Sequence, residues 1–225
     1  GQNLVLVSDA GTAAVSNQQA NLNAPVSALL LPSVIAAQTG ESPGTGQTTG
    51  SSVSVSDNTS AASAQGNQIT QSLALQAGTV ALGTGNAALT GGTDSDGRVS
   101  ASGSATLTNL QGNYGGGVAA VNAGSQIWLV ANGGGVPVAN STLVLDGNRQ
   151  EAVALGSGAT NTLTLARNPV GTGAGIASVQ MNDANSAVGA GLSNPEARLL
   201  VNGDLAGGSA ALTDNLQRAI AYGNS

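Results

Sequence analysis

Apolar and polar residues alternate with a period of two in short stretches of the chain, such as SVSVS, QSLALQ and NTLTLA. This alternation places apolar side chains on one face of an extended strand and polar side chains on the other. Gly, Asn-Gly and Asp-Gly separate the stretches, and these residues favour tight corners. The best helical candidate, residues 210–221, is explained better by a repeat than by an apolar helix stripe. The pattern therefore predicts an all-β protein built from short strands.

The chain contains an internal repeat. Residues 53–75 (VSVSDNTSAASAQGNQITQSLAL) align without a gap with residues 143–165 (LVLDGNRQEAVALGSGATNTLTL), a shift of 90 residues (143 minus 53). Asn58 aligns with Asn148. Gly66 follows Asn58 at the same spacing at which Gly156 follows Asn148. A long repeat of this kind is typical of solenoids.

Shorter copies of the motif, in which Asn or Asp is followed at four-residue steps by Ala and Gly, begin at Asp183 and Asn215. Their spacing predicts a repeat unit of roughly 18 residues. Residues 51–225 would then form roughly ten coils in a rod about 45 to 50 Å long.

The expected fold is a β-solenoid-like stack of short strands with Gly and Asn corners. Small Val, Leu and Ala side chains would fill its interior, because Phe is absent and aromatic residues make up only 1% of the chain. The corner Asn side chains would hydrogen-bond to one another along the stack. Positive φ is expected at Gly66, Gly156, Gly191 and Gly223. The alternative fold is a β-sandwich filament subunit joined by donor strands.

A domain boundary is predicted near Gly50. The residues before it hold three of the six prolines, and TGESPGTGQTTGSS is typical of a flexible link or an exposed loop. Residues 1–50 would form an N-terminal strand and a Pro/Gly-rich segment that links subunits, and residues 51–225 the β-repeat domain. The alternative is one continuous domain with a long surface loop.

Composition and charge narrow the location and the partners. Charged residues are only 7% of the chain, against roughly 25% in an average domain, and the net charge of −6 disfavours nucleic acid and anionic membranes. The longest apolar run, residues 28–37, contains Pro32 and is too short to span a bilayer. His and Cys are absent and all five basic residues are Arg, which together with the acidity favours a protein outside a bacterial cell. A start at Gly-Gln without Met favours a processed mature chain.

The same absences argue against catalysis. Without His and Cys, a Ser-His-Asp or Cys-His arrangement and an imidazole or thiolate zinc site cannot form. We therefore predict that the protein is not an enzyme and holds no cofactor. Asp94 and Asp96 in GGTDSDGRV form a weak calcium candidate, for which a plain turn is the favoured interpretation. Trp128 is expected to be a core or subunit-contact residue, with ligand stacking as the alternative.

The first strand-like stretch, GQNLVLVS, matches the second half of the repeat, with Gln2 at the position of Asn161. The last copy of the motif stops at Ser225, before that half. We therefore predict that the N-terminal strand of one subunit completes the C-terminal coil of the next, which would generate a head-to-tail filament. The predicted interface residues are Leu4, Val5, Leu6, Val7, Trp128, Ile220 and Tyr222.

The motif seen as NTSAASAQGN, NRQEAVALGS and NLQRAIAYGN, with ATNTLTL after its second copy, resembles the holdfast anchor proteins of stalked alphaproteobacteria. More distantly, it is similar to curli-type fibre subunits. The resemblance covers about residues 50 to 225. It implies an exported protein on the outer surface that holds cells to adhesive polysaccharide or to each other.

The sequence thus predicts a secreted bacterial cell-surface structural protein. It would assemble with copies of itself into a filament or anchor an adhesive layer. The alternative is a non-catalytic polysaccharide-binding adhesin module, and a third reading is a carbohydrate-active β-helix enzyme.

Overall fold

A computed structural model of the chain describes residues 2–6, 13–40, 48–76, 81–82, 85–90, 98–103, 105–132, 136–166, 170–171 and 174–225. These residues form extended strands and contain no helix. The strands are β1 (Gln2–Leu6), β2 (Ala13–Leu22), β3 (Val26–Leu30), β4 (Val34–Thr39), β5 (Ser52–Ser56), β6 (Thr59–Gln76), β7 (Ala81–Leu82), β8 (Gly85–Thr90), β9 (Arg98–Gly103), β10 (Ala105–Tyr114), β11 (Val118–Ala123), β12 (Gln126–Asn132), β13 (Val138–Ala139), β14 (Thr142–Asp146), β15 (Arg149–Ala166), β16 (Val170–Gly171), β17 (Ala174–Asn182), β18 (Val188–Ser193), β19 (Glu196–Asn202), β20 (Leu205–Ala206), β21 (Ser209–Thr213) and β22 (Leu216–Asn224). The predicted all-β class is confirmed.

The chain winds through three stacked layers, and equivalent strands of successive layers pair in parallel. Layer 1 comprises the described residues up to 70, layer 2 the described residues from 71 to 160, and layer 3 those from 161 to 225, since Gln2 pairs with Gln71, which pairs with Asn161. Apart from β8 and β9, which form an antiparallel hairpin, each strand thus lies on its counterpart in the next turn of the chain. The predicted solenoid-like stack is confirmed.

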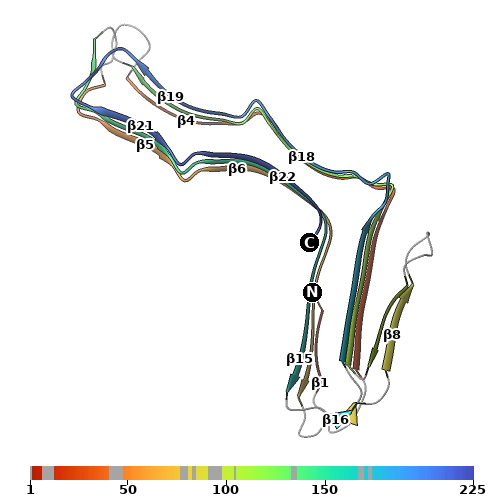
Figure 1. Cartoon of the computed structure of the whole chain (residues 1–225). Coiled ribbons are helices and arrows are strands. Elements are labelled where there is room, and N and C mark those ends of the chain that lie inside the picture. Colours follow the sequence, from red (N-terminus) through yellow and green to blue (C-terminus); the bar gives the residue numbers. More distant parts are fainter. Residues whose placement is uncertain are drawn as a thin grey trace.

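Each layer is a wide, flattened coil with two arms that meet at an angle (Figure 1). The sheet β1-β6-β15-β22, here called the bent sheet, runs from one arm into the other. In the first arm, the sheets of β11 and β12 face the sheet of β14 and the first half of the bent sheet. In the second arm, the sheet β2-β10-β17 lies across from the second half of the bent sheet, and the hairpin β8-β9 flanks it on the other side (Figure 1).

The two arms have different interiors. The first, here called the aliphatic arm, is filled by Val, Ile, Leu and Ala side chains such as Ile127, Leu129 and Leu145. The second, here called the amide arm, buries Leu73 and Leu107 together with polar residues. The buried polar residues of this arm include Asn17, Gln71, Thr106, Thr108, Asn109, Gln111 and Asn113. The predicted interior of small aliphatic side chains therefore describes the aliphatic arm, whereas the amide arm mixes aliphatic and polar side chains.

The bend of the bent sheet lies at glycines. In β6, Ala62 and Ala64 are buried before Gly66, whereas Asn67 and Ile69 are buried after it, so the inward-facing set changes parity at the bend. The 90-residue register between β6 and β15 continues across the bend, because Leu155 pairs with Gln65 before it and Ser157 pairs with Asn67 after it.

The prediction that Gly66, Gly156, Gly191 and Gly223 have positive φ is wrong. At the bend, glycine is needed instead because the next layer approaches closely: a Cβ at Gly66 would lie 2.4 Å from the carbonyl oxygen of Gly156. Positive φ occurs at other corners, where Gly alternates with Asn and Asp, the residues that best tolerate this region. Asp57, Gly147 and Asp214 are one such set, and they precede the equivalent strands β6, β15 and β22.

The 90-residue repeat is confirmed in register, since Val53 pairs with Leu143 and Leu73 with Leu163. The roughly 18-residue unit and the ten coils are wrong. Layers repeat after 92 residues from Asn17 to Asn109 and after 67 residues from Asn148 to Asn215. The period was misjudged because the short motif starting at Asp183 is not an equivalent copy: its Gly191 pairs with Val121, not with a bend glycine.

The described strands before residue 50 belong to the same stack. Strands β2, β3 and β4 pair with β10, β11 and β12, and β1 pairs with β6. The Pro/Gly-rich stretch of residues 41–47 lies outside the described residues.

Candidate assembly interface

Layer 3 exposes apolar ladders that the middle layer buries. Leu145 in layer 2 is 0% exposed, whereas its layer 3 neighbour Leu212 is 52% exposed. In the amide arm, Leu107 is 0% exposed and its layer 3 neighbour Ile176 is 49% exposed. The side chains of layer 3 are of the same type as those below them, but no described layer covers them.

The stack has a direction. A Cβ built on Gly66 meets the carbonyl of Gly156 in the layer above, and a Cβ built on Gly156 meets the carbonyl of Gly223 in the layer above that. At the corners, a Cβ built on Gly147 of layer 2 would instead lie 2.6 Å from Asp57 Oδ1 in the layer below. The end formed by layer 1 therefore differs from the end formed by layer 3, as a head-to-tail contact requires.

The bent sheet has an open edge at each end of the stack. Strand β22 pairs with residues 149–157 of β15, and β1 pairs with residues 71–75 of β6. Residues 161–166 of β15 consequently have a described neighbour on one edge only, which is β6. The two chain ends lie near the same point along the bent sheet (Figure 1), but β1 belongs to layer 1 and β22 to layer 3. The ends of the stack are thus staggered steps rather than flat faces.

Amide side chains form ladders along the stack. Asn58 Nδ2 donates to Asn148 Oδ1 at 3.0 Å, and Asn148 Nδ2 donates to Asn215 Oδ1 at 2.9 Å. The predicted hydrogen bonding between corner Asn side chains is therefore confirmed. Each ladder fixes the relative register of the layers, because a slip by one residue would separate the amides.

A second amide ladder crosses the amide arm. Gln180 Nε2 donates to Gln111 Oε1 at 3.2 Å, and Gln111 Nε2 donates to Gln19 Oε1 at 2.8 Å. These bonds run from layer 3 towards layer 1. At the layer 1 end, a cavity of about 440 Å³ is lined by Gln19, Ala20, Gly66, Asn67 and Gln68. The ladder thus ends in an opening lined by polar side chains.

The structure places the predicted interface residues on different surfaces. Leu4, Val5 and Leu6 lie in β1, paired in order with Leu73, Ala74 and Leu75, and Val7 lies outside the described residues. Leu4 therefore occupies the register predicted for it relative to the repeat.

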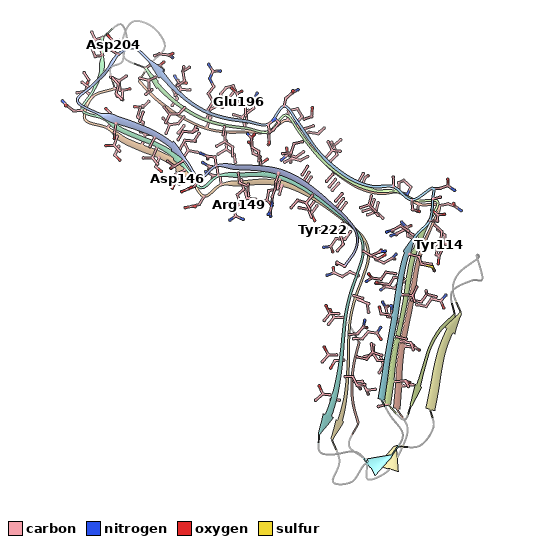
Figure 2. The ribbon with its side chains drawn as sticks, viewed as in Figure 1. Tyr114, Asp146, Arg149, Glu196, Asp204 and Tyr222 are labelled. Carbon is pink, nitrogen blue, oxygen red and sulfur yellow. The ribbon has the colours of Figure 1, made fainter. Side chains whose placement is uncertain are left out.

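Trp128 does not lie in the interior. It is half-buried on the outer side of β12, paired with Ala36 and Arg198, and its neighbours Ile127 and Leu129 face the core. Ile220 and Tyr222 lie together on the outer side of β22, paired with Val153 and Leu155 of β15, and Tyr222 lies close to the bend (Figure 2). Trp128 thus holds an outward position of the period-two pattern and not a core position, and its role as a subunit-contact residue stays a prediction.

Sequence analysis missed the layer 3 residues that are exposed along the stack axis. Leu212 and Ile176 were not selected, because an isolated Leu or Ile in a strand gives no sign of whether another layer covers it. The alignment of Asn215 with Asn148 was the available signal, because it marks layer 3 as a layer equivalent to layer 2.

On the outer side of the bent sheet, Glu151 of layer 2 pairs with Arg218 of layer 3 and with Arg149 of its own layer. Glu151 Oε1 lies 3.1 Å from Arg218 Nε and 3.9 Å from Arg149 Nη1. Arg149 and Glu196 lie on opposite outer sides of the aliphatic arm (Figure 2). The Arg149 and Arg218 side chains are 57% and 42% exposed, whereas the Glu151 side chain is only 11% exposed, so each pair joins a buried carboxylate to a partly exposed guanidinium.

A carboxylate ties a corner of layer 3 to layer 2. Asp183 Oδ1 accepts a hydrogen bond from Ser186 Oγ at 2.6 Å, and Asp183 Oδ2 accepts one from the Gly115 amide at 3.0 Å. The Ser186 hydroxyl, followed by the Gly115 amide, lowers the pKa of Asp183 below its usual 3.8. This corner is therefore stabilised by the ionised carboxylate.

Among the described residues, no group of three or more His, Cys, Asp or Glu could hold a metal ion. Asp94 and Asp96 lie outside those residues. The described part of the chain also contains no helix long and apolar enough to cross a membrane.

These features define a β-solenoid-like stack of wide parallel coils with two unlike, staggered ends. Comparisons with protein-family models, with curated proteins and with solved structures found no match.

Proposed function

We propose that the protein is a secreted bacterial cell-surface structural protein that assembles head to tail into a filament or anchors an adhesive layer. The carrying observation is the exposure of layer 3: Leu212 and Ile176 are half-exposed along the stack axis, in ladders that are fully buried one layer below. Burying a Leu or Ile side chain contributes about 1.5 to 3 kcal/mol, so covering these ladders favours association.

A second copy of the chain is the occupant that fits best. Its layer 1 carries the same ladder pattern, since Val55 belongs to the ladder of Leu145 and Leu212, and Val15 to that of Leu107 and Ile176. The contact between unlike ends does not close on itself, so it continues into a filament. The resemblance to holdfast anchor and curli-type proteins supports the same function and an outer-surface location.

The test compares two exposed leucines that face different directions. Leu212 is 52% exposed along the axis, and Leu29 is 62% exposed on the outer side of β3, whose inward-facing residues alternate with it. Negative-stain images and sedimentation velocity of the 225-residue chain should show concentration-dependent filaments for wild type and for Leu29→Asp. Leu212→Asp should remain a folded monomer.

Either of two results contradicts the proposal. One is a wild-type chain that stays monomeric at every concentration. The other is a Leu212→Asp variant that forms filaments as readily as wild type.

The alternative function, a polysaccharide-binding adhesin, is favoured by Trp128. Its ring is half-buried on an outer sheet surface, with Gln126 two residues before it and Arg198 on the next strand. Aromatic rings with nearby polar groups suit sugar binding. Since Trp128 is the one Trp of the sequence, its fluorescence reports directly on a titration with soluble polysaccharide. Quenching of the Trp128 fluorescence that saturates, and that is reversed when a competing neutral sugar is added, supports the adhesin. An unchanged spectrum argues against it.

A further inference from the structure

The bend ladder contains a glycine that nothing described in this chain requires. A Cβ on Gly66 would lie 2.4 Å from the Gly156 carbonyl oxygen, and a Cβ on Gly156 would lie 2.3 Å from the Gly223 carbonyl oxygen. Both distances are too short for any side chain. A Cβ on Gly223 would meet only Asn182 Nδ2, at an ordinary 3.5 Å, and Gly223 does not have positive φ.

The space above Gly223 is the place where the next layer's carbonyl would lie. Ala62, Ala152 and Ala219 are in register across the three layers, and each bend glycine follows its alanine four residues later. One further layer in the same register would place a Gly66 carbonyl over Gly223. We infer that the first half of β6 of a second copy pairs in parallel with β22, with Gly66 of that copy over Gly223. This inference rests on the proposed head-to-tail assembly and fixes its register.

An unpartnered buried atom supports the same register at the open edge of β15. Asn161 Oδ1 is buried and has no hydrogen-bond partner among the described residues. Gln2, Gln71 and Asn161 form one ladder through the three layers. In a further layer, Gln2 of the second copy would lie next to Asn161. A glutamine at that position carries an amide N–H, which is the donor that Asn161 Oδ1 lacks. The edge vacant at residues 161–166 thus takes β1 of the second copy.

The amide arm supports this register independently. Gln19 lines the layer 1 cavity, and within the described residues its Nε2 donates one long bond, of 3.3 Å, to the Gln68 carbonyl oxygen. In the inferred contact Gln19 would lie over Gln180, its equivalent in layer 3. Within the chain, each glutamine of this ladder donates to the one in the layer below, as Gln180 does to Gln111. Gln19 of the second copy would likewise donate to Gln180.

One pair of residues in the inferred contact is unfavourable, and its effect on assembly distinguishes this register from others. Asp214 of one copy would lie beside Asp57 of the next, whereas within the chain Gly147 stands between these two corner residues. Like charges on adjacent strands repel, and the repulsion decreases with salt. Asp57→Asn should therefore promote assembly.

The test uses Gly223→Ala, with Gly191→Ala as the matched control. A Cβ at Gly191 meets nothing within 4 Å, and Gly191 lies on the outer side of β18 opposite Val121. Both variants should melt at the wild-type temperature as monomers. Gly191→Ala should assemble with the wild-type critical concentration, whereas Gly223→Ala should raise that concentration at least about tenfold, because its methyl group meets a backbone carbonyl. Asp57→Asn should lower it a few-fold at low salt.

The outcomes separate the inference from the function. If wild type does not assemble, the proposed function fails. If wild type assembles and Gly223→Ala assembles equally well, the register is wrong while head-to-tail assembly stands. If Asp57→Asn leaves the low-salt critical concentration unchanged, the two carboxylates do not meet and the register is likewise wrong.

Discussion

Layers 2 and 3 have the same type of side chain in the same ladder, but they differ in burial. Leu145 is completely buried and Leu212 half-exposed, although both occupy inward positions of equivalent strands. The difference arises along the stack axis, not within the coil. A single coil of this protein cannot bury its own apolar face, and each layer depends on its neighbours, as in other stacked repeats.

The largest expected difference in stability between the layers concerns substitutions of the bend glycines. Gly66→Ala forces a methyl group against the Gly156 carbonyl in the fully packed middle layer and should destabilise the monomer by about 3 kcal/mol or more. Gly223→Ala, in the outer layer, should change the free energy of unfolding by less than about 0.5 kcal/mol. Urea unfolding of both variants measures the difference. Equal losses would mean that the close carbonyl approach is not what demands glycine.

The leucine ladder gives the next largest effect. Leu145→Ala should cost about 2 to 5 kcal/mol, because it removes buried methyl groups and leaves a cavity. Leu212→Ala should cost about 1 kcal/mol, since half of that side chain is already in contact with water. Thermal unfolding at a concentration where the chain is monomeric provides the measurement. A larger loss for Leu212 than for Leu145 would reverse the comparison between the layers.

The asparagine ladder should show the same order with smaller values. Asn148, 1% exposed, accepts from Asn58 and donates to Asn215 and to the Val55 carbonyl, so Asn148→Ala should cost about 2 kcal/mol. Asn58→Ala, at the end of the ladder, should cost about 1 kcal/mol or less. The double variant checks the coupling: additive losses would show that the amides do not act as a connected ladder.

Acid should weaken the corner at Asp183 slightly. Because the pKa of this group is lowered in the folded state, its stabilisation is present above the usual value of 3.8 and is lost as the pH falls through the folded-state pKa. The unfolding free energies of wild type and Asp183→Asn should therefore differ at pH 7, and the difference should shrink at about pH 3. A difference that grows on acidification would give the opposite sign to that expected for a depressed pKa.

The sequence was sufficient for the strand class and for the long repeat. Alternating apolar residues fixed which side chains face inward, and the gapless match of residues 53–75 with 143–165 corresponds to true neighbouring layers. The corner ladder of Asn58 and Asn148 followed from the same alignment. These features were predictable because backbone geometry imposes a period of two and because identical ladder positions face each other.

The coil width and the bend were not predictable in the same way. Equivalent residues lie 92 positions apart between Asn17 and Asn109 but 67 apart between Asn148 and Asn215, so no constant period exists to detect. The corners accept Gly, Asn or Asp equally, as at Gly147 and Asp214, and a glycine can serve either a turn or a close backbone approach. Only the packing between layers distinguishes these two uses.

The candidate interface was predicted in part for a similar reason. The register of Gln2 with the repeat was visible in the alternation, and β1 does occupy it against β6. The side chains that face along the axis, such as Ile176, could not be recognised without knowing which layer has no described neighbour above it.

The width of the coil has a mechanical consequence. The paired residues Gln71 and Asn161 of neighbouring layers lie 90 positions apart in the sequence, yet a layer adds only about 4.8 Å of height. Tension along the axis would act at once on the many backbone hydrogen bonds between two layers. These hydrogen bonds must break together instead of one after another. A wide coil thus adds little length along the axis for each residue, but it would give the stack a high resistance to tension along that axis.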